Sequence, residues 1–222
     1  MSSYTIIIEN KNTATGPPKV YNIYTEMPGI SGDTGLQSMF SVAWYKSLGI
    51  PRGGRDTFRF TTNVYAFVGS SSEYSTQLAA GHAINIINSA VAKVDPRRQK
   101  GSQFLLTKDF DINDSKEDRA KAGAFDFSVE SAFDEPNKYV VGVAREQVGG
   151  QLTPVAVVDL KSSADYVFEP KPKVYVSCTS VDRGEVFTPP TTAGQFAEIE
   201  YKDGRKTALV TESAGAFSIA YI

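Results

Sequence analysis

The sequence predicts an all-β protein with two tandem antiparallel β-sandwich domains, which arise from an internal duplication and are joined by a linker with one short helix. The chain contains 13 Phe and 11 Tyr with many Val, Ile and Thr, and such side chains suit a pleated, half-buried surface. Short alternating runs are separated by clusters of Gly, Pro, Asn and Ser. The strand patterns of the first half also recur in the second half.

The alternating runs fall into two groups along the chain. In the first half they are 4–10, 20–26, 40–44, 56–61 and 64–69. In the second half they are 125–131, 139–146, 155–160, 166–168 and 173–178. Because successive side chains of a strand point to opposite faces, each run can bury one face and expose the other. We therefore expect each run to form a strand.

The two groups of runs repeat each other. The segment "YTIIIEN" matches "FDFSVES", "KVYNIYTE" matches "KYVVGVARE", and "NVYAFVG" matches "KVYVSCT". Six matches of this kind keep the same order, which indicates a duplication rather than chance similarity. We predict a first copy at 1–112, a linker at 113–123 and a second copy at 124–222.

The linker contains the only reasonable helix candidate in the chain. In "NDSKEDRAKAG", Ser115 can cap a helix, Asp118 can complete a capping box, and Gly123 can end it. We expect one short helix within 113–123.

Composition limits the classes of partner. The chain carries 23 basic and 25 acidic residues, so it lacks the net basic face that nucleic acid requires. No run approaches the roughly 18 apolar residues of a membrane span. The start "MSSYTIIIENKN" has no basic region before an apolar run, unlike a secretory signal. We expect a cytoplasmic protein, or one released without a leader; the pattern indicates no particular oligomeric state.

The sequence predicts no cofactor. One His and one Cys cannot build a zinc or iron cluster, and Cys178 lies in the apolar pattern "KVYVSCT", where we expect a buried, inert thiol. Asp109, Asp111 and Asn113 match the first ligand positions of a calcium-binding EF-hand loop. However, Ala120 stands where that loop needs a bidentate Glu.

Aromatic side chains are the candidate ligand-binding groups. Trp44 and Tyr45 are neighbours with no aromatic counterpart in the second copy. Since they must point to opposite faces of a strand, one of them should lie near the surface, in a cleft or at the domain interface. Tyr21 and Tyr24 likewise fall on opposite faces. We predict Trp44, Tyr45 and Tyr24 as ligand-binding residues, with packing between the domains as the alternative.

His82 is the only histidine, so any Ser–His–Asp arrangement would have to use it. The sequence contains no G-x-S-x-G elbow. In the second copy Gln195 replaces His82, which also fits a simple turn or cap residue.

Specialised function is expected where the two copies diverge. Arg145 and Glu146 stand where the first copy has Thr25 and Glu26. We predict a pocket in or beside the first copy, facing the domain interface. His82 or Glu26 is its candidate catalytic or hydrogen-bonding group.

The motifs also carry a resemblance. The opening "YTIIIEN", then "NVYA", followed in the second half by "YVVGV", "FEP" and "VYVS", resembles a group of small, leaderless fungal proteins with two tandem β-sandwich units. This resemblance implies the fold and a fungal origin, and it brings no catalytic residues with it.

Two functions fit these observations. The first is a non-enzymatic protein that binds a small apolar molecule or a carbohydrate, in a lectin-like, defence or storage role. The second is a cofactor-independent cyclase or isomerase of fungal secondary metabolism, since such chemistry needs only a shaped pocket and a few ionisable groups. A closed apolar pocket with one or two buried ionisable groups favours the enzyme, and shallow aromatic patches favour the binding protein.

Overall fold

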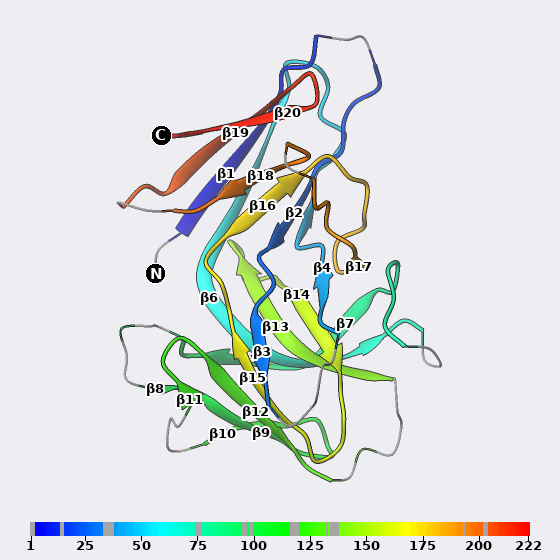
Figure 1. Cartoon of the computed structure of the whole chain (residues 1–222), viewed down its shortest axis with the longest axis vertical. Helices are drawn as coiled ribbons and strands as arrows, with labels where there is room; N and C mark the ends of the chain where they lie inside the picture. Colours follow the sequence, from blue (N-terminus) through cyan, green and yellow to red (C-terminus); the bar gives the residue numbers. More distant parts are fainter. Residues whose placement is uncertain are drawn as a thin grey trace.

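The computed structural model describes residues 3–13, 16–32, 38–73, 77–94, 97, 100–115, 120–131, 133, 138–192, 194–201 and 204–222. These residues form the strands β1 to β20 and no helix, which confirms the all-β prediction (Figure 1). It follows that none of the described residues belongs to a helix long and apolar enough to cross a membrane.

The largest sheet has nine strands and runs through the whole molecule. Its order is β17-β4-β14-β13-β6-β1-β19-β20, and β7 also pairs with β6. The strands are β1 (Ser3–Asn10), β4 (Phe40–Val42), β6 (Arg55–Ser71), β7 (Ile84–Ala92), β13 (Tyr139–Gln147), β14 (Leu152–Asp159), β17 (Val186–Phe187), β19 (Thr207–Ser213) and β20 (Ala216–Tyr221).

Three smaller sheets complete the fold. One has the order β10-β9-β12-β15-β3, one β18-β16-β2-β5, and one joins β11 to β8. Their strands are β2 (Asn22–Thr25), β3 (Gly29–Ser31), β5 (Tyr45–Lys46), β8 (Lys100–Gly101), β9 (Gln103–Leu106), β10 (Ile112–Asp114), β11 (Ala120–Lys121), β12 (Phe125–Val129), β15 (Asp165–Glu169), β16 (Val174–Ser177) and β18 (Phe196–Ile199).

The sheets form two sandwiches, one above the other in Figure 1. In the upper one, β20, β19, β1 and the first half of β6 face β18, β16, β2 and β5; we call it the terminal sandwich. In the lower one, β7, the second half of β6, β13 and β14 face β10, β9, β12 and β15; we call it the central sandwich. One hydrophobic cluster runs through both.

The chain passes between the sandwiches at two prominent places. The 17-residue strand β6 pairs with β1 in its first half and with β13 and β7 in its second half. The residues 170–173 connect β15 to β16 and run in the direction opposite to β6 (Figure 1). We call them the crossing segment.

The two sandwiches share one pairing pattern. β1 is parallel to β19 and antiparallel to β6, and β12 is likewise parallel to β9 and antiparallel to β15. Tyr175 of β16 lies opposite Tyr24 of β2, and Tyr65 of β6 lies opposite Ala144 of β13. The sequence repeat aligns Tyr65 with Tyr175 and Tyr24 with Ala144, so the residues that pair in one sandwich are equivalent to those that pair in the other. The agreement supports the internal duplication, which stays a prediction.

Each of the three larger sheets contains strands from both sides of the linker at 113–123. The terminal sandwich takes strands from the beginning and the end of the chain, and the central sandwich takes strands from its middle. If the chain is duplicated, the two copies therefore exchange halves.

The helix prediction is wrong where the structure describes the linker. β10 pairs with β9 through Asn113 opposite Leu105, and β11 pairs with β8. Gly123 has a φ of 79° and lies in the turn before β12. The predicted capping residue Asp118 lies outside the described residues. Pairing with β9 and β8 outweighs the local helix signal, because helix propensity is a weak preference that tertiary context overrides.

Cys178 is exposed, so the prediction of a buried thiol is also wrong. The strand β16 ends at Ser177, which is buried, and the chain leaves the sheet at the next residue. The pattern "KVYVSCT" therefore continues for two residues, Cys178 and Thr179, beyond the end of the strand.

Candidate functional site

A pocket of about 440 Å³ lies between the two sandwiches, and we call it the junction pocket. Residues of β1, β6, β11, β13 and the crossing segment line it, so the strand β6 and the crossing segment, which both pass between the sandwiches, border it. This volume lies within the range of small-molecule sites, roughly 300–1,000 Å³.

Three aromatic rings form one wall of the junction pocket. Tyr4 lies opposite Phe60 in the pairing of β1 with β6, with 5.7 Å between ring centroids. Tyr201 packs against both, at 4.6 Å from Tyr4 and 6.0 Å from Phe60. Its hydroxyl donates to the backbone carbonyl of Thr5 at 2.8 Å. The wall is therefore preorganised, and it offers an apolar surface to a ligand.

Arg145 is the buried cation of the pocket. Its side chain comes from β13 and the residue is only 8% exposed. Nη2 donates to the backbone carbonyl of Lys171 at 3.0 Å, and Nε is buried without a hydrogen-bond partner. Among the described residues, no carboxylate forms an ion pair with it. Burial lowers the pKa of Arg145 to about 10, so it stays charged at neutral pH.

An ion network lies beside Arg145. Glu169 accepts from Lys121 at 2.8 Å and lies 3.8 Å from Lys171. The hydrogen bond from Lys121 is the main cause that lowers the pKa of Glu169. With three cations and one carboxylate in its lining, the junction pocket has an excess of positive charge.

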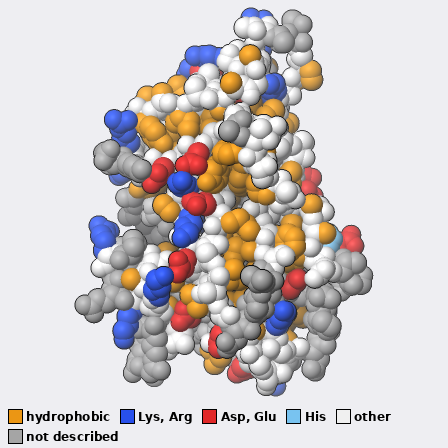
Figure 2. All heavy atoms as spheres, viewed as in Figure 1, with side chains coloured by type: hydrophobic (Ala, Val, Ile, Leu, Met, Phe, Trp, Pro, Cys, Tyr) orange, Lys and Arg blue, Asp and Glu red, His pale blue; other side chains and the backbone are white. Residues whose placement is uncertain are grey.

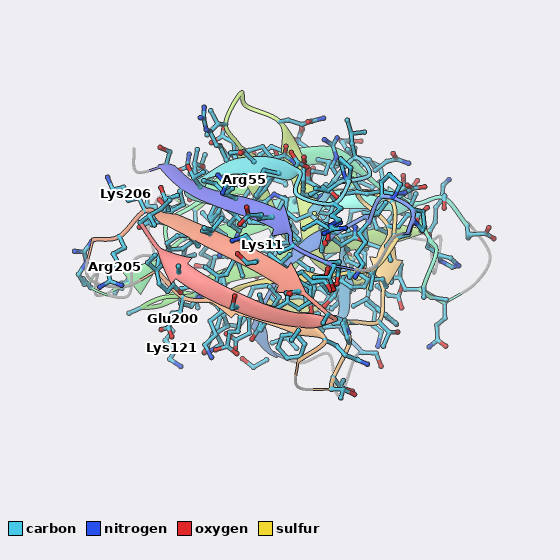
Figure 3. All side chains as sticks on the ribbon, turned by 90° about the horizontal axis from the view of Figure 1, so that it is seen from above. Lys11, Arg55, Lys121, Glu200, Arg205 and Lys206 are labelled. Carbon is cyan, nitrogen blue, oxygen red and sulfur yellow. The ribbon has the colours of Figure 1, made fainter. Side chains whose placement is uncertain are left out.

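Further basic groups lie on the same side of the molecule as the rim residue Lys121. In the view from above, Lys121, Arg205 and Lys206 project toward one side, together with Glu200 (Figure 3). The guanidinium of Arg205 lies over the ring of Tyr221, 5.9 Å from its centroid. Surface charges of one sign raise the local concentration of ligands of the opposite sign.

A second, smaller pocket of about 220 Å³ contains two predicted site residues. Tyr24 and Glu26 line it together with Ser41, Tyr175 and Glu198. Neither residue lines the junction pocket.

Trp44 and Tyr45 lie at different depths. Trp44 is fully buried and meets Phe58 and Phe60 edge-on, at 4.9 and 4.8 Å between ring centroids. Tyr45 is half-buried, and its hydroxyl donates to Asp56 at 2.8 Å. Trp44 therefore supports the aromatic wall from behind, through Phe60, and lines neither pocket.

His82 is half-buried in the turn before β7, outside both pockets. Its Nδ1 lies 3.4 Å from the hydroxyl of Ser71. Ser71 is only 2% exposed, so this pair offers no accessible nucleophile.

The residues of the junction pocket were not in the predicted site. Arg145 had one signal, since it interrupts the apolar run "YVVGVARE" and differs from Thr25 in the first copy. Tyr4, Phe60 and Tyr201 had none, because each lies in an ordinary strand or loop pattern and only the fold brings them together.

The fold and the junction pocket define a β-sandwich protein with a ligand-sized, positively charged cavity. The chain matches the family model described as RhiA over residues 1–221, and so belongs to the RhiA family. Neither the curated proteins nor the solved structures yielded a match. The resemblance to leaderless fungal proteins stays a prediction. Within the described part of the chain, no three His, Cys, Asp or Glu side chains gather in a group that could hold a metal ion.

Proposed function

We propose that this protein is a non-enzymatic binding protein whose junction pocket holds a small organic anion with an apolar or aromatic body. The observation that carries this proposal is Arg145, a buried guanidinium whose Nε has no partner and which forms no ion pair with a described residue. Leaving a charge buried and unpaired costs of order several kcal/mol. An anionic ligand would remove this cost.

The rest of the pocket fits the two ends of such a ligand. The guanidinium presents donors in a fixed fork, which suits a carboxylate, sulfonate or phosphate group. Tyr4, Phe60 and Tyr201 supply flat apolar surface for the body of the ligand. Lys121 and Lys171 add positive charge at the rim, partly balanced by Glu169.

Binding is favoured over catalysis by the state of the ionisable groups. Glu169 is engaged by Lys121, and the hydroxyl of Tyr201 is engaged by the carbonyl of Thr5. Burial raises the pKa of Tyr201 well above its ordinary value, so the phenol stays protonated at neutral pH. None of these groups is poised to exchange a proton with a ligand near neutral pH.

Native mass spectrometry tests the proposal without assuming the ligand. The wild-type protein and the variant Arg145→Met are purified from the same host, with Arg55→Gln as a control. Arg55 is an exposed arginine that pairs with Glu9 outside the pocket. We expect an acidic small molecule to accompany the wild type and the control and to be absent from Arg145→Met. A neutral or cationic adduct, or an adduct retained by Arg145→Met, would contradict the proposal.

A further inference from the structure

We propose that the smaller pocket is a second binding site, specific for an organic ammonium ion and above all for a methylated one. We call it the cage pocket. It is lined by residues of β2, β4, β16 and β18. Its ligand would be a cation, whereas the ligand proposed for the junction pocket is an anion.

Aromatic rings meet at right angles in the cage pocket. Tyr175 stacks on Tyr24 with 5.3 Å between ring centroids and an interplanar angle of 19°. Phe196 meets Tyr175 at 79° and 5.4 Å. Tyr175 and Phe196 are only half-buried, so they can still contact a ligand. Perpendicular aromatic walls are the arrangement with which proteins hold quaternary ammonium groups.

Two carboxylates border these rings. Glu198 pairs with Lys173 at 2.7 Å, which balances its charge. Glu26 also lines the pocket, and no described residue forms an ion pair with its side chain. Burial chiefly raises the pKa of Tyr175, and the charges of Glu198 and Glu26 add to the shift, which indicates that both carboxylates act on this ring. Lys173 acts on Glu26 only through electrostatics at longer range, so an organic cation would give Glu26 a direct ion-pair partner.

A buried hydroxyl points independently to a ligand. Ser41 lines the cage pocket, is 2% exposed, and its Oγ has no hydrogen-bond partner. Buried polar groups in native proteins are nearly always hydrogen-bonded. A hydroxyl or carbonyl on the body of the ligand would supply the missing partner.

Figure 2 shows the face of the molecule over β2, β16 and β18. Hydrophobic side chains gather over the region of β2, β16 and β18, and acidic and basic side chains alternate beside them. Because methylated ammonium groups are more weakly hydrated than a primary ammonium, an aromatic site of this kind favours them.

Calorimetric titration with choline tests this inference, with 3,3-dimethylbutan-1-ol as its uncharged isostere. We expect choline to bind at least tenfold more tightly than the alcohol. Replacing Tyr175 by Leu should weaken choline binding by roughly tenfold, and Glu26→Gln by roughly fivefold. Glu73→Gln, which removes an exposed carboxylate outside the pocket, should leave it unchanged.

Equal binding of choline and the alcohol would overturn the inference, as would an absence of choline binding or full binding by Glu26→Gln. If Tyr175→Leu fails to fold by circular dichroism, the comparison of the two ligands on the wild type and the Glu26→Gln result still decide the matter.

Discussion

Arg145 donates from Nη2 to the backbone carbonyl oxygen of Lys171 at 3.0 Å. Arg145 belongs to β13 of the central sandwich, and Lys171 belongs to the crossing segment that leads to the terminal sandwich. One hydrogen bond therefore fixes the buried guanidinium at the place where the chain passes between the sandwiches. The ligand site and the connection between the two halves of the fold share this contact.

Removing the charge of Arg145 should not destabilise the unliganded protein. Replacing buried ionic groups by apolar side chains of similar size is often neutral or stabilising. We expect the free energy of unfolding of Arg145→Met to equal that of the wild type or to exceed it by about 1 kcal/mol. Urea denaturation measures the difference. A loss of more than about 2 kcal/mol would mean that the arginine serves the fold, and would weaken its assignment to a ligand.

Because of Glu212, the free energy of unfolding should depend on pH in the acid range. Although burial opposes the shift, hydrogen bonds from Lys19, Tyr21 and the Gly215 N–H lower the pKa of Glu212. The resulting stabilisation is complete above the unfolded pKa of about 4.3 and is lost as pH falls through the lower folded pKa. We expect Glu212→Gln to cost about 2 kcal/mol at pH 7 and clearly less at about pH 3.

Denaturation of both proteins at the two pH values provides the check on Glu212. An equal cost at both would show that the charge of the carboxylate does not matter. Glu198→Gln is a suitable control, because the Glu198 pair with Lys173 is largely exposed and should contribute below about 1 kcal/mol.

Substitutions of Trp44 and Tyr45 should differ sharply in how much they lower the free energy of unfolding. Trp44 is fully buried against Phe58 and Phe60, so Trp44→Ala should lower the free energy of unfolding by about 3–5 kcal/mol. Tyr45→Phe removes only the hydrogen bond to Asp56 and should cost about 1 kcal/mol. Urea denaturation distinguishes the two. Similar costs for both would contradict the packing described for Trp44.

The thiol of Cys178 should react in the native protein. The residue is exposed, and partial desolvation raises the pKa of the thiol above its ordinary value. Since the thiolate is the reactive form, we expect maleimide labelling without denaturant but more slowly than free cysteine at pH 7. The difference in labelling rate between Cys178 and free cysteine should become smaller as pH rises. Labelling that requires denaturant would show that the thiol is shielded.

The positions of the strands along the chain could be predicted better than the pairing of strands in the sheets. β13 spans 139–147 against a predicted 139–146, because alternation along a strand is a local property. β6 is one strand where two runs, 56–61 and 64–69, were expected, since polar residues interrupt the alternation where the strand passes between the sandwiches. The parallel pairing of β1 with β19 joins the two ends of the chain and has no local signal.

In the candidate sites, too, residues close together in the sequence could be predicted, whereas residues from distant segments could not. Tyr24 lies in β2 and Glu26 directly follows this strand, within a segment that recurs in the second half of the sequence. Local sequence patterns therefore predict both residues, and both line the cage pocket. The junction pocket draws its aromatic wall and Arg145 from distant segments. A pocket that faces the interface between the two predicted copies stays a prediction, because the junction pocket lies between sandwiches that each contain strands from both sides of the linker.

The most direct test of the central claim is a calorimetric titration of the wild type and Arg145→Met with 1-naphthoate and with uncharged 1-naphthamide, which differ chiefly in charge. We expect the wild type to bind 1-naphthoate at least tenfold more tightly than the amide, since a hydrogen-bonded charge pair out of water contributes about 1.5–3 kcal/mol. Arg145→Met should lose this preference, while Arg55→Gln should keep it. Equal binding of the two compounds by the wild type, or an unchanged preference in Arg145→Met, would contradict the proposal that Arg145 holds an organic anion.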